Sequence, residues 1–435
     1  MEPIKRKIPT NLVIIITIFH FYSCGNNIGE DEYKLLYWSS NNPYEIEYAD
    51  YIINKWNKQN PTVLIKYQPV PEGRSSEEII LAAVVGKTTP DIYSNMWQGD
   101  VEAYAQAGIL IPLDSINGFI KYMYERCDSS VMEEITSNDG HIYQIPWKIN
   151  PIMMIYNQDY LLEAGYSSPP KTYSQFFDAA NKITKDTDGD GYFDRWFGYS
   201  EVKVDWWQRF FDYYPLYLGA SGGASLVENN RAVFNNEYSV QVFTFLQNIY
   251  KNQYFPQERL SARQDAFLSG AIAIRFTGPW EMIHAEKFKD EDFRYSYSTM
   301  PVPDRHEGPA FTYGDPKNIV LFNTCRNPQL AWKFLSFFCR KDNELEFLKI
   351  TTQYPRRKDL LTDSLFINYF DKNQMMKIFA EQAKYVRGTD ASPILKEVFD
   401  LISQEYEACV IYGVKSPEDA VKDAADAVDL LFIDK

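Results

Sequence analysis

The sequence predicts an α/β fold built on parallel sheets, in a chain long enough for two domains. Segments typical of strands and helices alternate three times within residues 33–93. The same alternation resumes after residue 145, and the end of the chain reads as helical, with Ser416-Pro417 starting its final segment. A chain of 435 residues can bury the cores of two such domains.

The first predicted strand covers residues 33–38, and a helix follows from Asn42 to Asn57. Asn42 and Pro43 are typical of a helix start, and the apolar residues that follow recur on one helical face. These are Ile46, Ala49, Ile52, Ile53 and Trp56. A strand is expected at 63–69, a helix from Ser75 to Gly86 and a third strand from Pro90, with Ser75 and Glu78 forming a capping box.

Residues 139–184 contain a turn, an extended segment and a capped helix in close succession. Asp139-Gly140 is a turn signal, and residues 145–156 are apolar and rich in strand formers. Pro146 and Pro151 restrict that segment to a sheet edge or to a crossing between domains. Thr172 and Gln175 have capping-box spacing and predict the next helix start.

The order of these pieces resembles the extracellular solute-binding proteins of ABC importers. The matching residues are Asp139-Gly140, Tyr143, Ile145-Pro146, Tyr156-Asn157, Asp159, Ala164-Gly165, Pro169-Pro170, Thr172-Tyr173 and Phe176. Further matches occur at Pro90-Asp91-Ile92, Gly278-Pro279-Trp280, Asn327-Pro328 and Pro355-Arg356-Arg357. The resemblance covers nearly the whole mature chain and is strongest to the sugar-binding branch, which includes the maltose-binding type.

The resemblance implies a two-lobed periplasmic-binding-protein fold of the Venus-flytrap kind, with a helical C-terminal segment. Each lobe would be discontinuous in sequence. Lobe 1 is expected to contain residues 33–144 and 312–357, and lobe 2 residues 145–311 and 358–435.

The N-terminus predicts export and lipid attachment. Lys5, Arg6 and Lys7 precede an apolar stretch at 12–22 that is short for a membrane-spanning helix. At the end of this stretch, residues 21–25 resemble a lipobox, with Phe21 in the usual place of leucine. We therefore expect a signal peptide at 1–23, lipidation of Cys24 and a tether at 24–32, which makes the mature protein an extracytoplasmic lipoprotein; an uncleaved signal anchor is the alternative.

Composition excludes several function classes. The formal net charge is −15, and removal of residues 1–23, which carry three basic and one acidic side chain, would leave −17. Such a chain is a poor partner for nucleic acid or an anionic membrane surface. No CxxC pair is present, and the four cysteines after Cys24 are expected to be buried thiols, with a Cys325–Cys339 bridge as the alternative.

Ligands of α/β proteins bind at the carboxyl ends of strands, and in two facing lobes these loops would line one cleft. Sugars offer an apolar face to aromatic rings and a rim of hydroxyls to polar side chains. The expected ligand-binding residues are Ser40, Asn41, Glu45, Trp97, Asp100, Trp147, Trp280, Tyr313 and Asp315. The resemblance implies that Trp280 stacks on a sugar ring and that Trp97 and Asp100 occupy positions used by the maltose-binding type. Trp206-Trp207 and Tyr213-Tyr214 fit either cleft or core.

The loop of residues 186–194 resembles the first nine positions of a calcium-binding EF-hand loop. Its candidate ligands are Asp186, Asp188, Asp190 and Asp194. Phe197 stands where such a loop places its bidentate glutamate, so the alternatives are a structural calcium site and an acidic surface turn. No other cofactor is expected.

No catalytic constellation is evident. Gly219, Ser221 and Gly223 match the G-x-S-x-G nucleophile elbow, but a turn-like segment follows them instead of a helix. The sequence has no HExxH, GxGxxG or P-loop motif. We therefore expect a non-enzymatic, monomeric binding protein that delivers a mono- or oligosaccharide to an ABC permease. The alternatives are a polyamine or phosphate-ester ligand, a secreted hydrolase with paired cleft carboxylates, and a sensory role.

Overall fold

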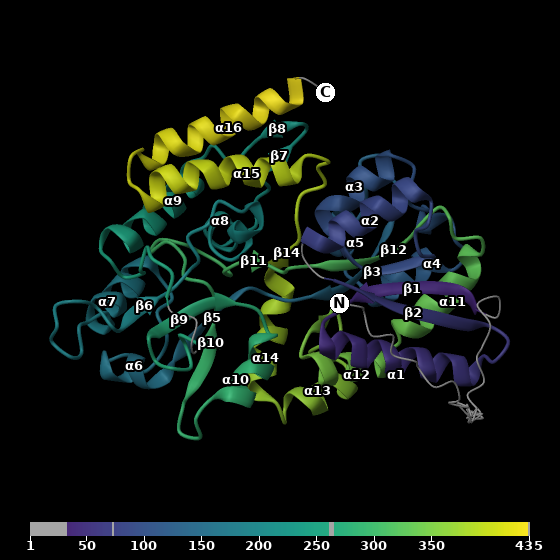
Figure 1. The fold of residues 1–435 in the computed structure, drawn as a ribbon, viewed down its shortest axis with the longest axis horizontal. Helices are drawn as coiled ribbons and strands as arrows, with labels where there is room; N and C mark the ends of the chain where they lie inside the picture. Colours follow the sequence, from purple (N-terminus) through teal and green to yellow (C-terminus); the bar gives the residue numbers. More distant parts are fainter. Residues whose placement is uncertain (1–32, 72–73, 261–264, 434–435) are drawn as a thin grey trace, which may run out of the picture.

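The computed structural model describes residues 33–71, 74–260 and 265–433. These residues form two α/β lobes joined in the middle of the molecule by extended segments (Figure 1). The predicted signal peptide, the lipidated Cys24 and the tether lie outside the described residues.

The first lobe is built on a six-stranded mixed sheet. Its strand order is β13-β4-β12-β3-β1-β2. The strands are β1 (Tyr33–Ser40), β2 (Leu64–Val70), β3 (Ile92–Trp97), β4 (Gln144–Ile149), β12 (Lys317–Leu321) and β13 (Tyr354–Pro355). β1 pairs in parallel with β2 and β3, as the alternation of strands and helices predicts, whereas β12 runs antiparallel between β3 and β4.

Helices cover both faces of this sheet. One face packs on α1 (Pro43–Gln59), α4 (Phe119–Arg126), α11 (Pro328–Phe338) and α12 (Lys341–Thr351), and the other on α2 (Arg74–Gly86) and α3 (Gln98–Gln106). Side chains alternate between the two faces along β1, so that both faces are apolar: Tyr37 packs in the first core and Trp38 in the second. The predicted helix after the first strand is confirmed, and Asn42 Oδ1 caps it by accepting a hydrogen bond from the Tyr44 amide.

The second lobe has a four-stranded sheet of order β10-β5-β9-β6. The strands are β5 (Met153–Asn157), β6 (Trp196–Gly198), β9 (Ile272–Thr277) and β10 (Tyr295–Ser298). One core contains α7 (Tyr173–Ile183), α8 (Tyr213–Ser221), α9 (Glu237–Lys251), α15 (Leu395–Tyr406) and α16 (Pro417–Ile433). The predicted cap of α7 is confirmed, because Thr172 Oγ1 accepts the Gln175 amide; the reciprocal bond of a capping box is displaced by one residue, since Gln175 Oε1 accepts the amide of Lys171 and not that of Thr172.

Three extended segments cross between the lobes. β11 (Thr312–Tyr313) pairs in parallel with β14 (Val386–Arg387), and the segment after β4 lies beside them. Gly314 is central, since its carbonyl accepts the Asn150 amide at 2.5 Å and its own amide donates to the Arg387 carbonyl at 3.0 Å. Backbone hydrogen bonds therefore join all three crossings.

The crossing after β4 begins later than the sequence predicts. The apolar stretch of residues 145–156 forms two strands, β4 and β5, which belong to different sheets. β4 pairs with β12 and β13, so residues through Ile149 lie in the first sheet, whereas the predicted boundary placed residue 145 onward in lobe 2. The pattern of apolar residues could not show where β4 ends and β5 begins, because both strands are buried and therefore apolar throughout.

Two further helices, α13 (Ser364–Phe370) and α14 (Gln374–Gln382), lie below the crossings and share a core with both lobes. In that core Leu345 and Tyr354 of the first lobe meet Ile155 of the second. This apolar contact connects the lobes on the side of the crossings where α12 and α13 lie (Figure 1).

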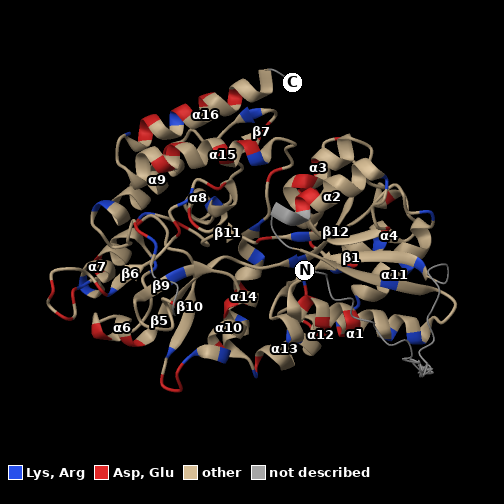
Figure 2. Cartoon of the chain, viewed as in Figure 1, with Lys and Arg blue, Asp and Glu red and all other residues tan. Residues whose placement is uncertain are grey.

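Acidic and basic residues are interspersed over both lobes (Figure 2). Cys127, Cys325, Cys339 and Cys409 are free and buried, which confirms the predicted thiols and rules out the alternative bridge. Within the described ranges, every helix is too short or too polar to cross a lipid bilayer.

Candidate ligand-binding cleft

A cavity of about 1280 Å³ lies between the two lobes. Lobe 1 lines it with the start of α1, the cleft ends of β3, β4 and β12, and parts of α2 and α3. Lobe 2 contributes the 3₁₀ turn η3 (Trp206–Phe210), the start of α10 (Glu281–Phe288) and the start of α15. Tyr313 and Asp315 line the cavity from a crossing segment. The volume exceeds the upper range of typical small-molecule pockets, roughly 1000 Å³.

Five aromatic side chains line the cavity from lobe 2. The ring of Phe211 lies edge-on to Trp280 at 6.2 Å and to Trp207 at 6.5 Å between centroids. Farther along, Trp206 packs on Phe210 at 5.7 Å. All five line the cavity, which resolves the open alternative for Trp206-Trp207 in favour of the cleft. Trp207 lines the cavity and is 40% exposed.

Two of the predicted tryptophans, Trp97 and Trp280, are each held against a glycine. A Cβ on Gly99 would lie 2.2 Å from the Trp97 ring, and a Cβ on Gly278 would lie 2.1 Å from the Trp280 ring. Only glycine therefore lets each indole fold back on its own turn. Trp97 is 8% exposed and Trp280 half-buried, and both line the cavity.

The turn that carries Trp280 is fixed at both ends by an ion pair. Arg275 on β9 donates to Glu281 Oε1 at 2.5 Å, and Glu281 is the first residue of α10. Asp265 accepts from the same guanidinium at 3.3 Å. Burial raises the pKa of Glu281, and the Arg275 charge counteracts part of this effect.

A buried ion pair lies on the lobe 1 wall. Lys148 Nζ contacts Glu45 Oε1, and both side chains are buried. Gln353 Nε2 also donates to Glu45 Oε1 at 2.8 Å, while Asn150 Nδ2 donates to Gln353 Oε1 at 3.0 Å. This network connects the start of α1 with β4 and with the first crossing, and it presents polar groups to the cavity.

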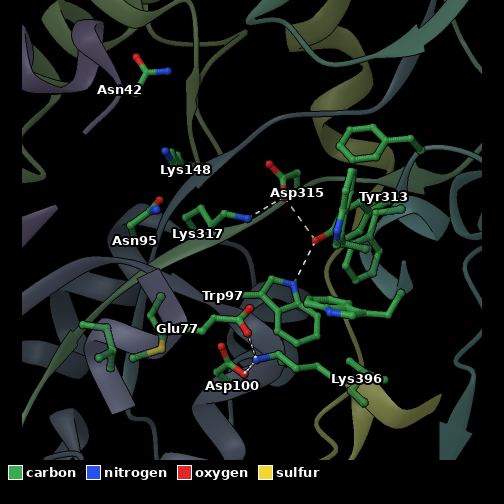
Figure 3. Close-up of a pocket in the computed structure, with 18 of the residues that line it drawn as sticks. Asn42, Glu77, Asn95, Trp97, Asp100, Lys148, Tyr313, Asp315, Lys317 and Lys396 are labelled. Atoms are coloured by element: carbon green, nitrogen blue, oxygen red, sulfur yellow. Dashed lines mark hydrogen bonds and ion pairs between the residues drawn. The ribbon is translucent and has the colours of Figure 1, made fainter. Parts of the chain in front are cut away.

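Tyr313 and Asp315 contact neighbouring cavity residues, as Figure 3 shows. Trp97 Nε1 donates to Tyr313 Oη at 3.2 Å, and Lys317 Nζ contacts Asp315 Oδ1 at 2.8 Å. Burial raises the pKa of Tyr313 well above its usual range, so its hydroxyl stays protonated at neutral pH. Asp315 has φ 37°, an uncommon left-handed backbone for a residue other than glycine.

Asp100 lies at the far end of the cavity in an interlobe ion cluster. Lys396 of α15 reaches across to Asp100 Oδ1 at 2.7 Å and to Glu77 Oε2 at 2.9 Å. Figure 3 shows these three side chains converging beside Trp97. Burial raises the pKa of Asp100, an effect that the Lys396 charge only partly offsets.

The structure places six of the nine predicted ligand-binding residues on the cavity: Glu45, Trp97, Asp100, Trp280, Tyr313 and Asp315. It does not bring the other three there. Trp147 was expected to line the cleft, but on β4 its side chain packs in the lobe 1 core against Phe338 and Phe347. Because side chains alternate along a strand, Lys148 lines the cleft instead.

Ser40 and Asn41 are the remaining corrections. Ser40 is 1% exposed, and its hydroxyl accepts the Asn42 amide at 2.9 Å, so it supports the turn into α1. Asn41 is exposed outside the cavity lining, whereas Asn42 and Tyr44 on the following turn line it. The predicted loop therefore contributes to the cleft, but through its later residues.

Sequence reasoning missed the lysines that neutralise the cleft, Lys317 and Lys396, together with Glu77. Lys396 is 296 positions beyond Asp100 in the sequence, so no local pattern connects them. Tyr213 and Tyr214, which were left undecided, are core residues, with their hydroxyls bonded to Ser239 and to the Gly388 carbonyl.

The acidic loop of residues 186–194 lies on lobe 2 away from the cleft. Carboxylate oxygens of Asp186, Asp188 and Asp194 lie within 4.8 Å of one another. Asp190 is outside that group and accepts the Tyr192 amide at 2.8 Å. Phe197, at the last loop position, has no donor oxygen, and its ring is buried in the core.

The G-x-S-x-G match does not form a nucleophile elbow. Ser221 is the last residue of α8, and Gly222 and Gly223 follow it with φ of 71° and 90° as the helix ends. An elbow requires a strand before the serine and a helix after it. The motif is a helix C-terminus.

Comparison with known proteins identifies the family. The family model described as "Bacterial extracellular solute-binding protein" matches residues 52–412. The chain is 24% identical to the maltodextrin-binding protein of Bacillus subtilis over 423 residues, covering 93% of this chain and 92% of that one. It is 22% identical to the maltotriose-binding protein of Pyrococcus abyssi, with coverage of 76% and 68%.

Solved structures share the fold. A protein from Listeria monocytogenes superposes with a TM-score of 0.80 at 27% identity, covering 92% of this chain and 99% of the other. The cyclic α-maltosyl-1,6-maltose-binding protein of Arthrobacter globiformis gives a TM-score of 0.77 at 20% identity, with the same coverage. The two-lobed architecture, the cleft between the lobes and the family match over most of the chain agree: the protein belongs to the family of bacterial extracellular solute-binding proteins.

Proposed function

We propose that the protein is the substrate-binding component of an ABC importer and that it captures a neutral oligosaccharide in the interlobe cleft. The observation that carries this proposal is the pairing of an aromatic wall on lobe 2 with a hydrogen-bonding wall on lobe 1. Rings of this kind bury the apolar faces of sugars, and carboxylates, amides and lysines bind the hydroxyls. The maltodextrin- and maltotriose-binding relatives support the same ligand class.

The charges of the cleft argue against a phosphate ester as the ligand. Among the described residues that line it there are three lysines and no arginine, and each lysine contacts a carboxylate. A phosphate ester would need unpaired or bidentate cations. The lining holds seven carboxylates against three lysines, so its net charge is negative and a polyamine is the alternative that the spermidine arm of the screen tests.

We propose that binding works by hinge closure about the three crossings. A ligand that contacts both lobes only when they are together stabilises the closed population. The closed form would then deliver the sugar to permease subunits, with the protein acting as a monomer held at the membrane by a lipid on Cys24. The relatives are named as binding proteins, which supports a non-enzymatic role.

A thermal-shift screen tests the ligand. The chain from residue 26 is mixed with maltose, maltotriose and longer neutral oligosaccharides, and separately with spermidine and with glucose 6-phosphate. A ligand at one hundred times its Kd stabilises the folded state by about 2.7 kcal/mol, which raises the melting temperature by several degrees. We expect shifts only with neutral sugars. A shift confined to spermidine or to the phosphate ester would contradict the proposal.

We also propose that the loop of residues 186–194 binds calcium. Asp186, Asp188 and Asp194 supply oxygen ligands of the type that calcium prefers. Millimolar calcium is expected to raise the melting temperature relative to EDTA, and magnesium less so. Asp186→Asn should abolish the response, while Asp371→Asn, a substitution of a half-exposed surface carboxylate, should keep it. Equal responses in both variants would show that the loop binds no calcium.

A further inference from the structure

Lys396 is a lobe 2 residue whose charge is neutralised by lobe 1. It lies in the first turn of α15, and its ammonium contacts Glu77 of α2 and Asp100 of α3 at 2.9 and 2.7 Å. The side chain is 28% exposed and that of Asp100 18%. This contact joins the lobes through side chains, in addition to the backbone crossings.

Two indole rings complete the surroundings of the ammonium. Lys396 Nζ lies 5.7 Å from the ring centroid of Trp97 and 5.6 Å from that of Trp206. The two rings belong to different lobes and are 5.1 Å apart at an interplanar angle of 48°. Carboxylates together with indole faces are the groups that attract an organic ammonium ion. We call these four residues, Glu77, Trp97, Asp100 and Trp206, the ammonium cage.

The cage carries one more negative charge than Lys396 neutralises. Burial works against the charge of Lys396, but the two carboxylates outweigh it and raise the pKa of the ammonium. With the lysine removed, two partly buried carboxylates would lie beside two tryptophan rings. These carboxylates and rings would bind a primary alkylammonium ion from solution, in the cleft that also contains the proposed sugar site.

We propose that Lys396 is an internal occupant of this cage, and that it determines specificity by excluding amine ligands from the cleft. The same contact joins α15 to α2 and α3 across the cleft. This proposal rests on the proposed function in one respect, namely that the cleft is the ligand site. Binding of amines by the cage does not depend on which sugar the protein binds.

Chemical rescue tests the proposal. Lys396→Ala removes the ammonium and most of its stem, and butylammonium chloride supplies a matching four-carbon chain with an ammonium end. We expect butylammonium to raise the melting temperature of Lys396→Ala, and calorimetry to give a Kd at least tenfold lower than for the unsubstituted protein. Sodium chloride at equal ionic strength and 1-butanol serve as solute controls.

Two variants serve as matched controls. Lys396→Arg keeps a cation in the cage and should not respond to butylammonium. Lys422→Ala removes a lysine paired with Asp426 at 2.5 Å on the exposed face of α16, and should not respond either. A response of Lys396→Ala no larger than that of Lys422→Ala would overturn the proposal.

A second substitution covers the case in which Lys396→Ala does not fold. Lys396→Met retains the apolar stem and vacates only the position of the ammonium. Ammonium chloride, compared with sodium chloride, should then stabilise Lys396→Met but not the unsubstituted protein, and equal effects on both would contradict the cage. A sugar titration on the same samples separates the hypotheses, since amine rescue without sugar binding would overturn the proposed function alone.

Discussion

Replacing Glu344 by glutamine is expected to lower the free energy of unfolding by about 3–5 kcal/mol, since removal of one partner leaves buried charges uncompensated. Glu344 is fully buried on α12, where Oε1 accepts from Arg126 Nη2 at 2.6 Å and Oε2 contacts Arg357. Glutamine keeps the volume and removes the charge. Arg126 would then lack its carboxylate, and Arg357 would keep only Asp359, which its Nε contacts at 2.5 Å.

The same substitution should affect the region next to the first crossing. Arg126 also donates to the carbonyls of Pro146 and Trp147 at 2.6 and 3.2 Å, so it holds the strand that carries Lys148 into the cleft. The loss is measured by chemical denaturation or by a fall in melting temperature on the order of 10 °C. Lys422→Met, which breaks an exposed ion pair, should cost less than about 1 kcal/mol. Comparable losses in the two variants would refute this view of Glu344.

Truncating Trp280 to alanine is expected to weaken binding of the oligosaccharide by about 2 kcal/mol, or roughly 30-fold in Kd. The half-buried ring lies on the lobe 2 wall of the cleft, over Gly278 and edge-on to Phe211. Alanine removes the surface on which a sugar ring would stack. Trp280→Phe retains a smaller ring and should give an intermediate loss.

A matched control comes from the same helix. Phe288, the last residue of α10, is 58% exposed and outside the cavity lining, so Phe288→Ala should leave the Kd unchanged. Isothermal titration calorimetry measures the affinity, and the melting temperature without sugar monitors folding. If Trp280→Ala binds as tightly as the control, the ring is a packing element and the stacking site lies elsewhere on the wall.

Local patterns predicted much of the fold, because they depend on neighbouring residues. The apolar face of α1, the Asn42 cap and the Thr172 cap are each decided within about one or two helical turns. The break between β4 and β5 was not predictable in this way, since the apolar pattern is continuous and only pairing with β12 separates the two strands.

The cleft was predictable where strand ends supply its residues and unpredictable where distant segments meet. Trp97, Glu45 and Asp315 follow or end strands, and the topology of an α/β sheet brings them together. Trp147 was misplaced because the pattern does not show which face of the extended segment points to the cleft, and alternation along β4 places its side chain in the core. Lys396 was missed because its partners are set by lobe packing, which leaves no local trace in the sequence.

The position of β12 has a consequence for the order of folding. This strand pairs with β3 on one side and with β4 on the other, yet it comes from residues 317–321, long after both neighbours. Until it arrives, β3 and β4 each have an unsatisfied edge, so the first sheet cannot close from the first 150 residues alone. Contacts of such sequence separation fold slowly, and a chain that emerges N-terminus first would remain incompletely folded until roughly three quarters of it had been made. Lobe 2, whose four strands lie within residues 153–298, would be able to form its sheet before lobe 1 completes its own.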